Sequence, residues 1–250
     1  MAKKVRLDQR VFALGLAESR ERAQALILAG QIVVGEHVAT KAGQPVDESA
    51  EIRRKGEPMP WVSRGGLKLV HALEQFAIDV SGCDALDVGA STGGFTDVLL
   101  QRGARQVCAV DVGTNQLAWK LRQDPRVWSM EQVNARHLDV LGLPFQPEVI
   151  VCDVSFISLT LILPKLVEAA AARGRIIVCL VKPQFEVGRG EVGKGGVVRE
   201  EEKRLAMVDK VVECARSLGC EVGGVCASPI TGPAGNVEYL VALRPPVRGA

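Results

Sequence analysis

Short apolar runs alternate with segments of helical periodicity from residue 83 onward. The runs, in order, are CDALDV, QVCAVDV, RVWSM, EVIVCDV, RIIVCLV, EVGGVCA and VEYLVAL. Amphipathic patterns predict helices near residues 94–101, 158–172 and 200–218. Continuous apolar strands separated by helices are typical of a mostly parallel, seven-stranded α/β sheet that helices cover on both faces. Only a turn-rich loop joins the last two runs, so we expect the last strand to be antiparallel.

The first 58 residues carry a different pattern. SRERAQALILAG predicts a helix with Ser19 as its N-cap and Gly30 just after its end. QIVVGEHVA predicts a hairpin that turns at Gly35. These short elements indicate a small α+β domain ahead of the large sheet.

Length and composition agree with one large and one small domain. The chain has 250 residues, of which 47% are hydrophobic and 24% charged, and its net charge is +2. KGEPMPW, in which two prolines flank Met59, predicts a semi-rigid linker. We therefore predict a small domain at 1–58, a linker at 59–62 and a large domain at 63–250.

Membrane insertion, export and zinc binding have little support in the sequence. No apolar run approaches the roughly 18 residues that a spanning helix needs. The apolar segment VFALGLA follows KKVR, but Asp8, Glu18 and the lack of a small-residue cleavage site argue against export. The seven cysteines form no C-x-x-C pair, and none of the three histidines is close to one. We expect a cytoplasmic protein without a bound metal.

Basic residues near the N-terminus suggest a phosphate partner. Residues 1–58 contain ten basic and eight acidic side chains, which accounts for the whole net charge. Arg20 and Arg22 lie in the first turn of the predicted helix, where the helix dipole disfavours cations. Phosphate groups of a nucleic acid are the usual partner of such residues.

The N-terminal segment RLDQRVFALGLAESRERAQALILAGQIVVGEHVATKAGQPV resembles the S-four-type RNA-binding module of ribosomal and RNA-modifying proteins. The resemblance implies that Arg6, Arg20 and Lys41 face RNA phosphates, with Ser19 and Arg22 as further candidates. A small helical domain with ordinary surface charge remains the alternative.

A glycine-rich turn follows the first strand of the large domain. In ALDVGASTGGF, Gly89, Gly93 and Gly94 bracket a turn in which backbone amides can approach a ligand closely. A dinucleotide fingerprint requires glycine where this chain has Ser91. Asp111, at the end of the second strand, can bind ribose hydroxyls of either cofactor class. The pattern resembles motif I of class I S-adenosylmethionine-dependent methyltransferases, which implies that Gly89, Ser91 and Gly93 line the amino-acid end of the cofactor.

A second glycine-rich segment, GRGEVGKGG, matches the G-x-x-x-x-G-K pattern at residues 188–194. A phosphate-binding loop then requires serine or threonine, but this chain has Gly195, and KPQFEV separates the segment from the preceding strand. We therefore disfavour an NTPase. Arg189, Lys194 and Arg199 are more typical of a mobile loop that contacts substrate, or of an unstructured surface loop.

Polar residues stand at the ends of three predicted strands. Asp153 follows EVIVC, Lys182 follows RIIVCLV and Glu238 opens VEYLVAL. The carboxyl ends of parallel strands meet at one edge of a sheet, and an antiparallel last strand brings Glu238 to the same edge. Each residue has an ordinary explanation by itself, as a turn cap or an ion-pair partner. Together they indicate a site.

Lys68 stands in the segment VSRGGLKLVHALEQF, which has helical periodicity. Leu69, Ala72, Leu73 and Phe76 form its apolar face. Lys68 lies off that face, so the pattern by itself predicts an ordinary solvent-exposed lysine.

The motifs together resemble one family over nearly the whole chain. An S-four-type module followed by WVSRGGLKL, LDVGASTGGF, DVSFIS, VKPQFE and GPAGNVEYL is similar to the TlyA (haemolysin A-like) family of ribosomal RNA 2′-O-methyltransferases. The resemblance implies a class I, Rossmann-like methyltransferase domain of the FtsJ type. It also implies a catalytic tetrad of Lys68, Asp153, Lys182 and Glu238, and a cytidine ribose in ribosomal RNA as methyl acceptor.

Cofactor and partners follow from the same resemblance. It implies S-adenosyl-L-methionine as cofactor, held by Gly89, Ser91, Gly93, Gly94, Asp111, Asn134 and Asp153. The expected partner is ribosomal RNA or a ribosomal subunit, without a membrane or a metal; the oligomeric state is left open, with a monomer as one option. Transfer to a hydroxyl needs a group that accepts its proton, and a neutral lysine can serve. The alternatives are an RNA-binding protein with an inactive methyltransferase fold and a membrane-active haemolysin.

Overall fold

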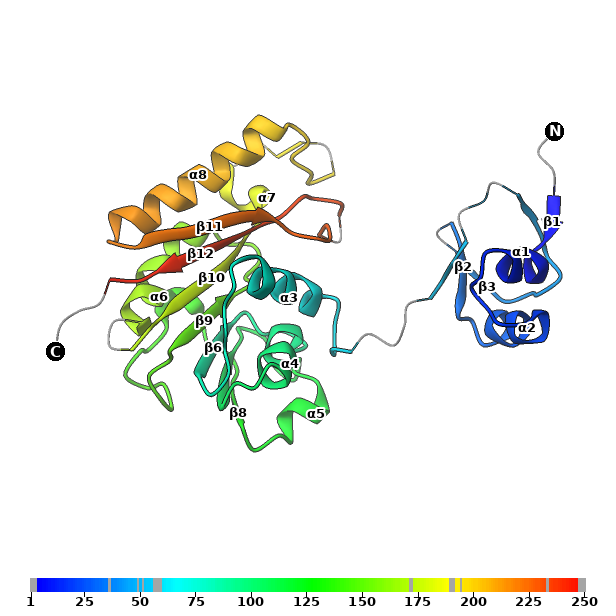
Figure 1. Cartoon of the computed structure of the whole chain (residues 1–250). Helices are drawn as coiled ribbons and strands as arrows, with labels where there is room; N and C mark the ends of the chain where they lie inside the picture. The colour runs from blue at the N-terminus through cyan, green and yellow to red at the C-terminus, as the bar shows by residue number, and fades with distance from the viewer. Residues whose placement is uncertain are drawn as a thin grey trace. The chain divides into compact units, whose positions relative to one another are not determined.

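The computed structural model divides the chain into two compact units, Met1–Pro60 and Trp61–Ala250 (Figure 1). The structure describes residues 4–35, 37–48, 50, 52–55, 60–170, 173–188, 192–193, 195–232 and 234–246. Met59 of the predicted linker, and Arg189 and Lys194 of the predicted substrate loop, lie outside these residues. Among the described helices, none is long and apolar enough to cross a membrane.

The N-terminal unit contains two helices and two small antiparallel sheets. Its elements are β1 (Lys4–Arg6), α1 (Leu7–Ala13), α2 (Arg20–Leu28), β2 (Ile32–Val34), β3 (His37–Ala39), β4 (Pro45–Asp47) and β5 (Ile52–Arg54). β1 pairs with β4, and β2 lies between β3 and β5. The predicted helix and hairpin are both present. Ser19 caps α2 by accepting a hydrogen bond from the Arg22 amide at 3.1 Å, and the hairpin turns at Gly35, whose φ is +57°.

The second unit is built on one seven-stranded sheet. Its strands are β6 (Asp84–Val88), β7 (Gln106–Val110), β8 (Val127–Met130), β9 (Val149–Cys152), β10 (Ile176–Val181), β11 (Glu221–Ala227) and β12 (Tyr239–Arg244). The strand order is β11-β12-β10-β9-β6-β7-β8. β12 is antiparallel to both of its neighbours, and the other pairs are parallel. All seven predicted strands and the antiparallel last strand are confirmed.

Helices cover both faces of this sheet (Figure 1). They are α3 (Gly65–Gln75), α4 (Gly94–Gln101), α5 (Trp119–Arg122), α6 (Leu163–Ala170), α7 (Pro183–Glu186) and α8 (Glu201–Ser217), with 3₁₀ turns η1 (Ala135–His137) and η2 (Leu159–Leu161). Side chains alternate along each strand. In β9, Val149 and Val151 pack with α3 and α4, whereas Ile150 and Cys152 pack with α6 and α8. Such two-sided burial explains why the strands read as continuous apolar runs.

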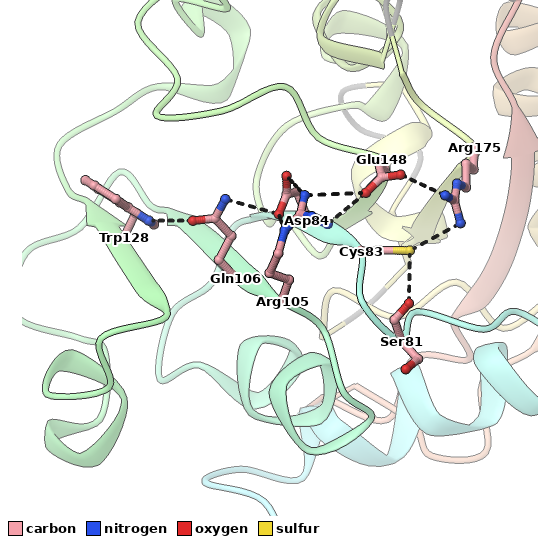
Figure 2. Close-up of polar contacts among 8 residues, drawn as sticks. All are labelled: Ser81, Cys83, Asp84, Arg105, Gln106, Trp128, Glu148 and Arg175. Carbon is pink, nitrogen blue, oxygen red and sulfur yellow. Dashed lines mark hydrogen bonds and ion pairs between the residues drawn. The ribbon is translucent and has the colours of Figure 1, made fainter.

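Ion pairs connect the amino ends of neighbouring strands at one edge of the sheet (Figure 2). The Arg105 guanidinium binds the carboxylate of Asp84, the first residue of β6. Glu148, just before β9, accepts a hydrogen bond from the Asp84 amide at 3.2 Å. It also forms an ion pair with Arg175 at 2.9 Å. Both acids are buried, at 4% and 8% exposure. The hydrogen bond from Arg105 lowers the pKa of Asp84.

Candidate active site

The glycine turn after β6 leaves no room for side chains. Gly89 has φ of +83°, and a Cβ on it would lie 2.6 Å from the Asp153 carbonyl oxygen. Gly93 has φ of +93°, and a Cβ on it would overlap Leu121 Cδ1. Ser91 also adopts a left-handed conformation, with φ of +48°. The tight backbone therefore approaches β9 and α5 closely, which side chains at these glycines would prevent.

A cavity of about 530 Å³ opens beside this turn. Five of the seven predicted cofactor residues line it: Gly89, Ser91, Asp111, Asn134 and Asp153. Apolar side chains, among them Val110, Val133 and Ile162, complete the wall. The other two predicted residues do not line it. Gly93 lies against leucines of the α5 region, and Gly94 faces a neighbouring cavity.

Asp111 links the turn to the following loop. Its Oδ2 accepts a hydrogen bond from the Ser91 amide at 2.8 Å, and its Oδ1 accepts one from the Gly113 amide at 2.7 Å. A carboxylate oxygen has a second lone pair, so both oxygens can still accept from a ligand. Asn134 caps η1, because its Oδ1 accepts from the Arg136 amide at 3.0 Å.

A second cavity, of about 320 Å³, adjoins the first. All four residues of the predicted tetrad line it: Lys68, Asp153, Lys182 and Glu238. The two cavities share part of their walls, at Gly89, Ser91, Asp153 and Ser155. A ligand in one cavity can therefore meet a ligand in the other.

The tetrad is a chain of close charges. Lys68 Nζ lies 2.6 Å from Glu238 Oε2 and 3.8 Å from Asp153 Oδ2. Lys182 Nζ lies 2.6 Å from Asp153 Oδ1. Asp153 follows β9, Lys182 follows β10 as the N-cap of α7, and Glu238 precedes β12. Two lysines alternate with two carboxylates, so each ammonium group has an acidic partner when both lysines are protonated.

Lys68 contradicts the pattern-based expectation of a solvent-exposed lysine. Only 7% of it is exposed, because the polar side of α3 near its N-terminus faces the strand ends rather than water. Small residues permit this approach. A Cβ on Gly66 would lie 2.8 Å from the Trp61 ring, and one on Gly94 would lie 3.1 Å from the Gly66 amide nitrogen.

Three residues near the tetrad were missed from the sequence. Ser155 Oγ accepts a hydrogen bond from Lys182 Nζ at 2.7 Å. Phe156 has φ of +65° and is 90% exposed at the rim of the larger cavity, with its ring 5.0 Å from that of Phe185. Glu186 is buried and binds the start of η2. All three lie within the motifs DVSFIS and VKPQFE, next to Asp153 or Lys182, and this was their signal in the sequence.

Asp87 is a buried carboxyl just before the glycine turn. Thr96 Oγ1 donates a hydrogen bond to its Oδ2 at 2.6 Å. Its other oxygen has no hydrogen-bond partner within the described part of the chain. Burial raises the pKa of Asp87 to about 7. This carboxyl lines neither cavity.

The predicted RNA-binding residues of the N-terminal unit have different surroundings. Arg6 and Arg20 converge on the buried Asp8 carboxylate, at 2.9 and 3.4 Å from its Oδ2. The hydrogen bond from Arg6 holds the pKa of Asp8 far below its usual range. Lys41 is exposed, whereas Ser19 serves α2 as its cap. Asp8 therefore brings two of the predicted arginines together.

A buried amide anchors part of the glycine-rich loop. Asn236 accepts a hydrogen bond from the Val198 amide at 3.0 Å and donates one to the Gly196 carbonyl at 2.9 Å. Arg199 borders a separate cavity of about 380 Å³. No cluster of three metal-ligating side chains occurs among the residues that the structure describes.

Comparison with known families and proteins gives consistent matches to both units. The model of the FtsJ-like methyltransferase family matches residues 61–245, and that of the S4 domain matches residues 5–52. The chain is 49% identical to the 16S/23S rRNA (cytidine-2′-O)-methyltransferase TlyA of Mycobacterium tuberculosis, over 98% of this chain and 91% of that protein. It is 43% identical to Hemolysin A of Brachyspira hyodysenteriae, over 94% and 98% of the two chains.

Solved structures agree with these matches. The solved structure of a protein described as a hemolysin, from Streptococcus thermophilus, superposes with a TM-score of 0.75 at 46% identity. The match covers 98% of this chain and 90% of that one. Aeropyrum pernix fibrillarin, solved with bound S-adenosyl-L-methionine, superposes with a TM-score of 0.50 at 14% identity, covering 78% of each chain. The second likeness concerns the fold alone.

Proposed function

We propose that this chain, which belongs to the FtsJ-like methyltransferase family and within it to the TlyA (hemolysin A-like) group, methylates the 2′-hydroxyl of cytidine in ribosomal RNA. The observation that carries the proposal is the pair of adjoining cavities. One is bordered by the glycine turn and the other by two lysines and two carboxylates. Such an arrangement suits the meeting of a methyl donor and a hydroxyl acceptor.

The larger cavity fits S-adenosyl-L-methionine. Its volume lies in the range of cofactor sites, and its wall combines apolar side chains with a few polar groups. Gly89 lines the cavity, and its missing Cβ lets the turn pack against the Asp153 carbonyl. Asp111 offers carboxylate oxygens to ribose hydroxyls. When bound, the cofactor supplies an electrophilic methyl group on a sulfonium. Asn134 and Asp153, which also line the cavity, would contact it.

The smaller cavity would receive the acceptor ribose. Lys182 Nζ is the group that we assign to take the proton of the 2′-hydroxyl. Asp153 and Glu238 hold the two lysines in place and balance their charge. Phe156, exposed at the rim of the adjoining larger cavity and left-handed in its backbone, is our candidate to stack on a base.

RNA binding is assigned to the S4 domain. Arg6, Arg20 and Lys41 would contact phosphates, with Ser19 acting through the helix cap. A ribosomal RNA or subunit as substrate also makes the cytoplasm the expected compartment. We expect Arg20→Ala to weaken RNA binding more than cofactor binding, and to reduce the slope of affinity against salt by about one phosphate contact. Filter-binding titrations across several salt concentrations measure this slope, and an unchanged slope would remove Arg20 from the interface.

Incubation with labelled S-adenosylmethionine and separated ribosomal subunits tests the main proposal. Mapping of alkali-resistant positions should locate label on the ribose of a cytidine. Label on a base atom, or no transfer to either subunit, contradicts the proposal. Binding of RNA and cofactor without transfer would favour an inactive methyltransferase fold instead. Direct lysis of vesicles by the purified protein would favour the membrane-active alternative.

A further inference from the structure

Ser155 occupies a distinctive position beside the tetrad. Its hydroxyl accepts a hydrogen bond from Lys182 Nζ at 2.7 Å. It is also one of the residues shared by the walls of both cavities. The hydroxyl therefore lies where the two ligands of the proposed reaction would meet, and it touches the group assigned to accept the proton.

The neighbours of Lys182 Nζ restrict the direction in which its lone pair can point. Its two oxygen neighbours are Asp153 Oδ1 at 2.6 Å and Ser155 Oγ at 2.7 Å. A neutral lysine amine has two N–H donors and one lone pair. The hydrogen bond to Ser155 fixes one N–H, and Asp153 lies on a second side of the nitrogen as an ion-pair partner. The lone pair is thereby restricted to the remaining directions, and Lys182 lines the smaller cavity.

Lys68 has different neighbours. Both of its close oxygens belong to carboxylates, Glu238 at 2.6 Å and Asp153 at 3.8 Å. Lys68 is therefore held between two carboxylates. Lys182 has an uncharged hydroxyl as its second neighbour. The two lysines of the tetrad therefore have separate tasks, and the hydroxyl of Ser155 marks the one suited to act as base.

The segment that carries Ser155 is anchored at its other end. Glu186, 2% exposed, accepts hydrogen bonds from the Leu159 amide at 2.7 Å and from Ser158 Oγ at 2.5 Å. Glu186 lies on α7, which begins immediately after Lys182. The segment is thus tied to α7 and its N-cap twice, once at Ser155 and once at Glu186. Such double attachment restrains the hydroxyl although the residue is exposed.

We propose that Ser155 is a positioning residue that orients Lys182 Nζ toward the acceptor hydroxyl. The inference rests on the proposed function. In the step, the acceptor oxygen gives its proton to Lys182 Nζ and its electron pair to the methyl carbon. The bond from that carbon to sulfur breaks, and its electrons remain on sulfur. The positive charge of the sulfonium is thereby replaced by that of the Lys182 ammonium, which later releases its proton to water.

Kinetics of Ser155→Ala test the proposal. We expect kcat to fall by about 10- to 100-fold, because the base is no longer held in line. KM for RNA and Kd for S-adenosylmethionine should each change by less than about threefold, the size of one lost weak hydrogen bond. Ser155→Thr keeps the hydroxyl and should recover most of kcat. Ser217→Ala, which removes a hydroxyl bonded to the Cys214 carbonyl on distant α8, should behave as wild type.

Two kinetic outcomes overturn the proposal. An unchanged kcat in Ser155→Ala would remove any role in the reaction. A loss of cofactor affinity that parallels the loss of kcat would assign Ser155 to the cofactor instead of Lys182.

A chemical readout separates this inference from the proposed function. Limited acetylation by acetic anhydride, without RNA or cofactor and with mass-spectrometric quantification, compares Lys182 with Lys68. Loss of the hydrogen bond frees Lys182 Nζ, so Ser155→Ala should raise its labelling about threefold relative to Lys68. An unchanged ratio would overturn the inference. If the wild-type protein transfers no methyl group, the proposed function fails, whereas this ratio still reports whether Ser155 restrains Lys182.

Discussion

The two edges of the large sheet use charge in opposite ways. At the amino edge, exposed arginines cover buried acids, as Arg105 covers Asp84 and Arg175 covers Glu148 (Figure 2). At the carboxyl edge the lysines are buried as well, and the tetrad borders an open cavity. Charges at the first edge close the end of the sheet. Charges at the second edge lie beside a cavity, where ionisable side chains can exchange protons with a bound ligand.

Left-handed non-glycine residues occur at both ends of the sheet, with Ala77 ahead of the amino end of β6, but those beside the cavities lie at the carboxyl edge. At the carboxyl edge, Ser91 and Phe156 adopt left-handed conformations, and Gly89 stands where any side chain would meet the backbone of β9. Left-handed non-glycine residues cost free energy and are concentrated at functional sites. The amino edge is therefore organised for stability and the carboxyl edge for binding, within one sheet.

Removal of Lys182 should have the largest effect. Lys182→Ala deletes the proposed base, so methyl transfer should fall by at least about 1000-fold. Cofactor affinity should change little, because Lys182 does not line the larger cavity. Single-turnover transfer and calorimetric titration of cofactor measure the two effects. Arg175→Ala, at the amino edge, is the matched control and should retain wild-type transfer. Activity in Lys182→Ala would remove the distinction between the edges.

Gly89→Ala should damage both stability and cofactor binding. The new Cβ would meet the Asp153 carbonyl oxygen in a backbone with φ of +83°, so we expect a loss of about 1–3 kcal/mol and weaker cofactor affinity. Gly103→Ala is a control with φ of +88° and a nearest contact of 3.2 Å to the Ser81 hydroxyl, away from the cavity. It should lower the melting temperature without changing cofactor affinity. Equal cofactor affinities in the two variants would contradict the assignment of Gly89.

Glu148→Ala should affect stability alone. It removes the acceptor for the Asp84 amide and the partner of Arg175, and we expect a loss of about 1–2 kcal/mol. Urea denaturation measures the loss, while kcat at a temperature well below melting should stay unchanged. Arg175→Ala should cost less than about 1 kcal/mol, because that side chain is 65% exposed. A kcat defect in Glu148→Ala would show that the amino edge also serves the reaction.

Two carboxyls on β6 give the smallest and sharpest test. Arg105 lowers the pKa of Asp84, whereas burial raises that of Asp87 to about 7. Between about pH 4 and 7 the folded state keeps the proton of Asp87 and the unfolded state has lost it. Asp87 therefore makes stability fall as pH rises through this window. The contribution of Asp84 has the opposite sign, since it is lost as pH falls.

Asp87→Asn removes the unfavourable contribution and keeps an acceptor for Thr96. We expect the variant to be more stable than wild type at pH 8 by about 1–3 kcal/mol, with the difference shrinking toward pH 5. Urea denaturation at both values measures it. A stability difference that does not change with pH would mean that Asp87 titrates normally.

Much of the fold was predictable because its signals are local. The seven strands, the helix at residues 94–101 and the antiparallel last strand were all predicted from apolar runs and loops. The glycine turn was predicted too, since its conformation depends on a few adjacent residues. Asp153, Lys182 and Glu238 could be grouped because a parallel sheet brings strand ends to one edge.

The burial of Lys68 could not be predicted from local periodicity. Periodicity identifies the apolar face of α3 but not what covers the polar face, and only the structure shows that this face meets the strand ends. Resemblance to a known family assigned a role to Lys68, whereas Ser155 and Glu186 lie inside the quoted motifs DVSFIS and VKPQFE without an assigned role. Nothing near Asp8 in the sequence predicts that it binds Arg6 and Arg20, which lie on other elements.

The sequence by itself determined the strands, the helices, the turn and the residue types available for chemistry, because these depend on burial and backbone preference within a few neighbours. Only the assembled fold determines which lysine lies beside which oxygen and that the two cavities share a wall. It also determines that the pKa of Asp84 is lowered while that of Asp87, on the same strand, is raised. Those properties depend on distances between segments far apart in the chain, and they arise only when the sheet is assembled.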